Sequence, residues 1–100
     1  MARLNIAAGN WKMNKDMESA LGATRTIANT SRPDDVLTIL GVPYPYLKPL
    51  IDQTLYVDNL DIAAQNCHHE ESGAFTGEVS AGMLDSCGVC LLYTSPSPRD

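Results

Sequence analysis

Short apolar runs alternate with helix-like segments along this chain, and this alternation constrains the fold more than any other feature. The runs at residues 4–9, 36–42 and 60–66 have the length and the apolar content of strands that are buried on both faces. A segment with helical signals separates each run from the next. Because this order is typical of α/β proteins, the sequence predicts an α/β fold with a parallel sheet.

The first helix is predicted from its apolar spacing. Residues 17–28 place small and aliphatic side chains on one face of a helix. Asn14 is expected to cap its start, and Asp16 and Glu18 are expected in the first turn, where the helix dipole favours acidic groups. A polar, Pro-containing segment at residues 29–35 should end it.

Two further helices are expected to be short. The second begins in the segment 43–54, where Pro43 and Pro45 suit a first turn, but Pro49 lies deeper and should shorten or kink it. The third is predicted over about residues 79–86, after a polar loop that contains two glycines.

Composition narrows the functional classes. One hundred residues are enough for one small domain, and a net charge of −5 argues against a general nucleic-acid binder, which needs a basic face. No apolar run approaches the ~20 residues of a membrane helix. The N-terminus has one arginine and a short apolar run that Asn5 interrupts, so no secretory signal is expected and the cytoplasm is the predicted location.

The cysteine and histidine residues are not expected to form a metal or redox site. Cys67, Cys87 and Cys90 are an odd number, and the C-x-x-C pair falls at the end of a predicted helix rather than at the start of one. The segment 67–71, Cys-His-His-Glu-Glu, consists of adjacent residues whose side chains point in different directions. No metal is therefore predicted.

Polar residues follow two of the predicted strands. Asn10 and Lys12 come after the first strand, and Gln65 and Asn66 end the third. Parallel strands place their carboxyl ends at one edge, where α/β proteins bind ligands. An ammonium group beside an amide suits a phosphate or a developing oxyanion. The alternative is that Lys12 is a solvated residue at a strand end. Trp11, between them, should point to the opposite side and pack behind the sheet.

Four segments of the sequence closely resemble segments of one protein family. AAGNWKMN, GVPYPYL, IAAQN and GAFTGEVSAGMLDSCGV occur in the order and at the separations found in the N-terminal part of triosephosphate isomerases. The resemblance covers about residues 4–89. It implies the first three to four β/α units of a TIM (β/α)8 barrel, a fold that needs about 250 residues to close.

The resemblance also implies an activity and its residues. The family interconverts dihydroxyacetone phosphate and glyceraldehyde 3-phosphate in glycolysis and gluconeogenesis, without metal or cofactor. Asn10 and Lys12 match its substrate-binding pair, with Lys12 neutralising the phosphate and the developing charge. Thr76 would approach the active site of a partner subunit, and Glu78 would lie at the interface. The loop implied to enter the partner in a homodimer comprises Gly73, Ala74, Phe75, Thr76, Gly77 and Glu78.

The resemblance stops after Val89. The family continues through a fourth strand to a Gly-His-Ser-Glu-Arg-Arg motif that contains its electrophilic histidine, whereas this sequence has CLLYTSPSPRD. The electrophile and the later glutamate base have no counterpart in these residues. Residues 90–100 are therefore expected to be an unrelated or artefactual tail, the alternative being a natural flexible one, and this fragment alone is expected to be inactive. A small non-enzymatic α/β module that binds phosphate or a partner is the alternative function.

Overall fold

A parallel three-stranded sheet forms the centre of the computed structural model, which describes residues 5–92. The strands are β1 (Asn5–Asn10), β2 (Val36–Val42) and β3 (Leu60–Ala64), in the order β1–β2–β3. Ile39 of β2 pairs with Ala8 on one side and Asp61 on the other. The predicted α/β fold with a parallel sheet is confirmed.

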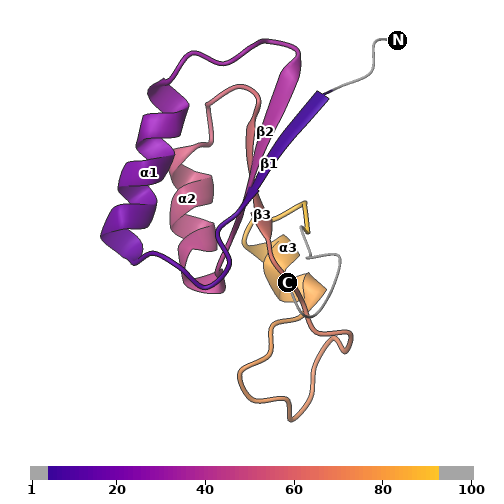
Figure 1. Cartoon of the computed structure of the whole chain (residues 1–100). Coiled ribbons are helices and arrows are strands. Elements are labelled where there is room, and N and C mark those ends of the chain that lie inside the picture. The colour runs from indigo at the N-terminus through magenta and orange to yellow at the C-terminus, as the bar shows by residue number, and fades with distance from the viewer. Residues whose placement is uncertain (1–4, 93–100) are drawn as a thin grey trace.

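Two helices lie side by side on one face of this sheet (Figure 1). They are α1 (Met17–Asn29) and α2 (Leu47–Gln53), and a 3-10 turn, η1 (Tyr44–Tyr46), leads into α2. The short helix α3 (Ala81–Ser86) lies near the carboxyl end of β3, beside a loop that projects from the body (Figure 1). The prediction that the proline-rich segment forms only a short helix is confirmed.

The buried side chains come mainly from β2, β3 and the helices. Leu50 and Val42 are fully buried. The other hydrophobic members of the core cluster are Ala20, Leu40, Leu47, Leu60, Ile62, Ala64, Leu84 and Val89. The core therefore buries the carboxyl end of β2, next to the residues that follow β1 and β3.

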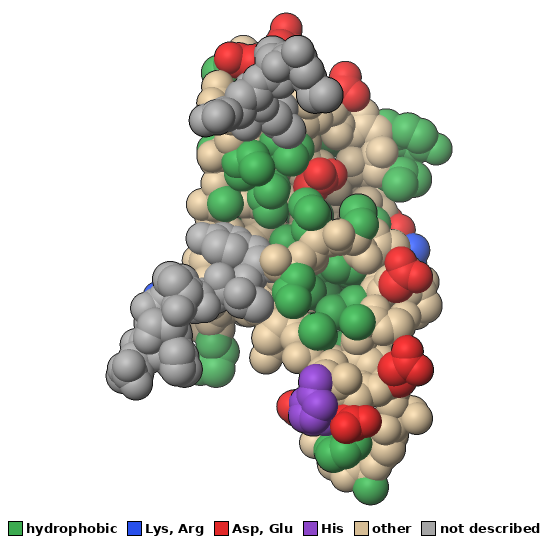
Figure 2. Space-filling model, turned by 90° about the vertical axis from the view of Figure 1, so that its right-hand side faces the viewer, with side chains coloured by type: hydrophobic (Ala, Val, Ile, Leu, Met, Phe, Trp, Pro, Cys, Tyr) green, Lys and Arg blue, Asp and Glu red, His purple; other side chains and the backbone are tan. Residues whose placement is uncertain are grey.

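The prediction that the first strand is buried on both faces is wrong. Residues 5–8 of β1 are exposed, and the side chain of Ile6 keeps 59% of its accessible surface. β1 is an edge strand with a neighbour only on the β2 side among the described residues. The helices cover one face of the sheet, and hydrophobic side chains gather on the face turned away from them (Figure 2). Residues 36–39 of β2 are likewise only partly buried.

The helix α1 begins later than predicted. Asp16, not Asn14, is its cap: the Asp16 carboxylate accepts the Ser19 backbone N–H at 2.9 Å, and the Asp16 N–H donates to the Ser19 hydroxyl at 3.0 Å. These hydrogen bonds, the one from the Ser19 backbone first, lower the pKa of the Asp16 carboxyl. Asn14 instead donates to the Trp11 carbonyl at 2.7 Å. Lys15, at φ 77°, reverses the chain between them, so the helix cannot start at Asn14.

The carboxyl-terminal elements differ from the predictions by a few residues. β3 ends at Ala64 rather than Asn66, and α3 begins at Ala81, with the Ser80 hydroxyl accepting the Met83 N–H at 3.2 Å. Leu92 forms an isolated parallel β-bridge with Ala64, on the side of β3 where a fourth strand would pair. Leu4 and residues 93–100 of the proposed tail lie outside the described residues. Within residues 5–92, the helices are too short and too polar to cross a membrane.

Candidate functional site

Three polar residues from two strand ends meet at the carboxyl edge of the sheet. The side-chain amide of Gln65 donates to the Asn10 side-chain oxygen at 3.1 Å and to the Lys12 carbonyl at 3.0 Å. The same nitrogen lies 3.1 Å from the Gly41 carbonyl at the end of β2. The predicted meeting of the first and third strand ends is therefore confirmed.

The backbone of Lys12 has an unusual conformation. Its φ of 56° lies in the left-handed region, which costs a residue with a side chain about 1–2 kcal/mol. The Lys12 N–H donates to the Asn10 side-chain oxygen at 2.8 Å, so both polar groups of the Lys12 backbone are bound. Strain of this kind persists only where the surroundings determine it, and it is concentrated at functional sites.

A pocket of about 250 Å³ lies beside Lys12. Residues 42–45 supply an apolar wall, while Lys12, Gln65 and Asn66 supply the polar part of the lining. Lys12 is the only cation among the described residues that line it, and no carboxylate of the described residues forms an ion pair with Lys12. A small apolar-walled pocket with one exposed ammonium fits an anionic ligand.

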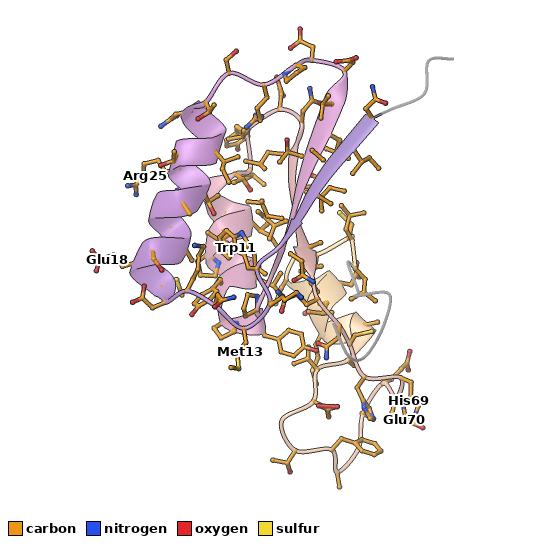
Figure 3. The ribbon with its side chains drawn as sticks, viewed as in Figure 1. Trp11, Met13, Glu18, Arg25, His69 and Glu70 are labelled. Carbon is orange, nitrogen blue, oxygen red and sulfur yellow. The ribbon has the colours of Figure 1, made fainter. Side chains whose placement is uncertain are left out.

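Trp11 and Lys15, in the same turn as Lys12, make packing contacts and do not line the pocket. Trp11 packs against the core on the side of the helices, as predicted, while Met13 points away from the body and is 94% exposed (Figure 3). The Lys15 ammonium lies 5.3 Å from the centre of the Trp11 ring, and the Tyr46 hydroxyl donates to the Lys15 carbonyl at 2.5 Å. Lys15 is thus engaged with the ring, and Lys12 is the cation at the pocket.

Tyr44 connects the pocket wall to the loop after β3. Its hydroxyl donates to the Asn66 backbone carbonyl at 2.9 Å and also contacts the Asn66 side-chain oxygen. Partial burial raises the pKa of the Tyr44 phenol, and the charges of Cys67 and Glu78 raise it further. The neutral phenol is therefore held as a hydrogen-bond donor.

The loop at residues 66–80 projects from the body and returns close to where it started (Figure 1). At its neck, the His68 N–H donates to the Val79 carbonyl at 2.7 Å and the His68 ring nitrogen Nδ1 lies 3.4 Å from the Glu78 carboxylate. The His68 ring packs at 4.4 Å from that of Phe75, measured between centroids. His69 and Glu70 point outward from the far side of the loop (Figure 3).

Two glycines give this loop its turns, as the sequence predicts. Gly73 has φ 140°, and a Cβ there would lie 2.6 Å from the Phe75 ring. Gly77 has φ 87°. Residues 73–78 are all exposed, and Phe75 keeps 44% of its surface. The loop therefore presents a preformed shape with an exposed aromatic side chain.

Gln65 lies at the edge of the sheet that its sequence position predicts, but no role was predicted for it, and Tyr44 was not predicted to belong to the site. A donor amide directly after a third strand, near an amide after the first, is the signal for Gln65. Nothing in the local sequence marks Tyr44, because its contact with Asn66 joins residues 22 apart.

Known proteins with similar sequences identify the family. The family model described as triosephosphate isomerase matches residues 5–94. The chain belongs to the triosephosphate isomerase family. It is 41% identical over 100 residues to the triosephosphate isomerase of Cytophaga hutchinsonii, with 97% of this chain and 39% of that protein covered. It is also 41% identical over 99 residues to that of Acetivibrio thermocellus, with 99% of this chain and 39% of that protein covered.

A third triosephosphate isomerase, from Porphyromonas gingivalis, is 39% identical over 102 residues and covers 97% of this chain. The chain spans 39% of the length of each of these relatives. The parallel sheet of residues 5–64 and the parallel contact at Leu92 thus correspond to the N-terminal part of a triosephosphate isomerase barrel.

Proposed function

We propose that this chain acts as the N-terminal part of a triosephosphate isomerase, which interconverts dihydroxyacetone phosphate and glyceraldehyde 3-phosphate in the cytoplasm as a step of glycolysis and gluconeogenesis. The observation that carries the proposal is the family match over residues 5–94. The position of Lys12 at an apolar-walled pocket supports it, because a triose phosphate is a small dianion.

In this proposal Lys12 and Asn10 bind the substrate. The Lys12 ammonium neutralises the phosphate and stabilises the charge that develops on the substrate oxygens, and the Asn10 amide donates a hydrogen bond beside it. The reaction only moves protons, so the proposal requires no metal or cofactor. In this proposal the electrophile and the base come from the part of the barrel that residues 1–100 do not cover.

We also propose that the complete protein is a homodimer in which residues 73–78 enter the partner subunit. The projection of the loop, its exposure and the exposed Phe75 ring support this role. Thr76 then approaches the active site of the neighbour, and Glu78, next to His68, lies at the interface. The shape of the loop is already fixed by its own contacts, which lowers the entropic cost of binding.

The activity can be tested in a completed enzyme, in which residues 1–89 of this chain replace the aligned segment of the Acetivibrio thermocellus triosephosphate isomerase. Isomerase turnover is expected from the completed enzyme. Residues 1–100 alone are expected to show none, because proton transfer needs a base within about 3 Å of the proton. A folded completed enzyme without turnover would contradict the proposal, as would turnover by residues 1–100.

The dimer can be tested by shortening the loop between Gly73 and Gly77 in the completed enzyme. Sedimentation is expected to show monomers with reduced activity. A matched change, Glu18→Ala on the exposed face of α1, should leave the dimer intact (Figure 3). A loop-shortened protein that keeps the mass of a dimer would refute the interface.

A further inference from the structure

Gln65 joins the ends of all three strands at the pocket. Its amide nitrogen lies within 3.1 Å of the Asn10 side-chain oxygen, the Lys12 carbonyl and the Gly41 carbonyl. Asn10 is the last residue of β1, Lys12 lies two residues after it, and Gly41 is the second-last residue of β2. The amide nitrogen has two N–H hydrogens for three oxygens, so one of these hydrogens is shared between two acceptors.

The contacts of Gln65 converge on Lys12, which is the only residue with a left-handed backbone among the described residues that line the pocket. Lys12 is held at φ 56° by two hydrogen bonds, one from its N–H to Asn10 and one from Gln65 to its carbonyl. Gln65 also binds the Asn10 oxygen that accepts the Lys12 N–H. One side chain thus fixes the Lys12 carbonyl directly and the Lys12 N–H through Asn10.

We propose that Gln65 is a positioning residue that keeps Lys12 in its left-handed conformation and thereby sets the place of its ammonium at the pocket. The inference rests on the proposed function, since it assigns to Lys12 the charge that the substrate meets. Without the amide, the Lys12 backbone can relax toward ordinary φ values, which moves the ammonium. A displacement of about 1 Å at a reacting centre can lower the rate by about a hundredfold.

Gln65→Met is the main variant, because methionine keeps the length of the side chain and removes the donor. In the completed enzyme it should lower kcat/KM by at least about tenfold. The matched control is Gln53→Met on α2. Gln53 is also partly buried and donates to a backbone carbonyl, that of Leu21 at 3.1 Å, but it does not line the pocket. The control should change stability and leave kcat/KM near that of the parent.

A double-mutant cycle separates positioning from general support. In a Lys12→Ala background, Gln65→Met should have little further effect on kcat/KM, because the group that it positions is absent. Equal effects of Gln65→Met in both backgrounds would overturn the proposal. So would a Gln65→Met variant with kcat/KM within about twofold of the parent.

Gln65→Glu supplies a readout that a purely structural role would not move. The isosteric carboxylate cannot donate to the three oxygens, but its protonated form can donate once. Relative to the parent, its activity should rise as the pH falls toward the pKa of a glutamate, ordinarily about 4.3. A ratio of activities that does not change with pH would count against the assignment.

A crystal structure of the Gln65→Met variant gives a test that needs no turnover. Lys12 is expected to leave the left-handed region in the variant and to keep it in the parent and in Gln53→Met. If the parent lacks isomerase activity, the proposed function fails. The role of Gln65 is still tested in that case, because the φ angle of Lys12 can be compared between the parent and the variant. A Lys12 that keeps φ near 56° in the variant would refute that role.

Discussion

Replacing Lys12 with alanine in the completed enzyme tests the electrostatic role of the pocket most directly. Two unit charges 4 Å apart interact by about 1 kcal/mol in water and about 4 kcal/mol at an effective dielectric constant of 20. Lys12 is exposed in the described part of the chain, but the wall at residues 42–45 is apolar, and a closed site would exclude more water. The loss should therefore approach the larger value.

The expected effect of Lys12→Ala is a fall in kcat/KM of about 10²–10³-fold, which agrees with the usual effect of removing one preorganised electrostatic donor. Lys12→Arg keeps the charge, but its planar fork does not fit the place of a compact ammonium, so it should also be poor. The assay is steady-state kinetics at several salt concentrations, since screening separates an exposed charge from an enclosed one.

Lys15→Ala is the matched control for Lys12→Ala. It removes a lysine three residues away, but the Lys15 ammonium lies over the Trp11 ring. Most of the activity should remain in this variant. A fall of only about fivefold in Lys12→Ala, the value expected for a charge in bulk water, would show that Lys12 is a solvated strand-end residue.

Three further predictions concern the loop, the first helix and the pocket wall. Gly73→Ala should weaken the dimer in sedimentation, because its Cβ would lie 2.6 Å from the Phe75 ring, whereas Gly22→Ala on α1, with open space around it, should raise the free energy of unfolding by about 0.5–1 kcal/mol. Because folding lowers the pKa of Asp16, the cap stabilises α1 fully above the unfolded pKa of about 3.9 and loses that effect as the pH falls through the folded pKa. The melting temperatures of Asp16→Ala and the parent should therefore become equal below the folded pKa. The raised pKa of Tyr44 means that its contribution is complete below about pH 10 and is lost as the pH rises through the folded value; difference absorbance against Tyr44→Phe should show one phenol titrating late.

The sequence was sufficient to predict the elements because local patterns determine them. Strand β2 has the predicted bounds, and the short apolar runs gave the three strands of the parallel sheet. The cap of α1 was misplaced because Asn14 and Asp16 are both good capping residues. Which of them caps depends on the left-handed Lys15 between them, and that conformation has no local signal in the sequence.

Burial and long-range contacts could not be predicted in the same way. The apolar run of β1 is typical of a buried strand, but its exposure depends on which elements lie against it. The role of Gln65 depends on a contact with Asn10 across 55 residues. The family resemblance implies that Asn10 and Lys12 act as a pair, and the structure shows that Gln65 contacts both of them.

Adjacent residues after β3 connect the pocket with the projecting loop. Gln65 binds Lys12 and Asn10, and the next residue, Asn66, accepts the hydrogen bond of Tyr44 in the pocket wall. The loop at residues 66–80 begins at this point, so the residue that donates to the Lys12 carbonyl is the direct neighbour of the loop base. If a partner subunit anchors the loop, as proposed, the same contacts hold the base of the loop and the conformation of Lys12. In that case the strained Lys12 backbone is stabilised by the sheet and by the dimer together, which gives a physical reason for the proposed phosphate site and the proposed interface loop to share one strand end.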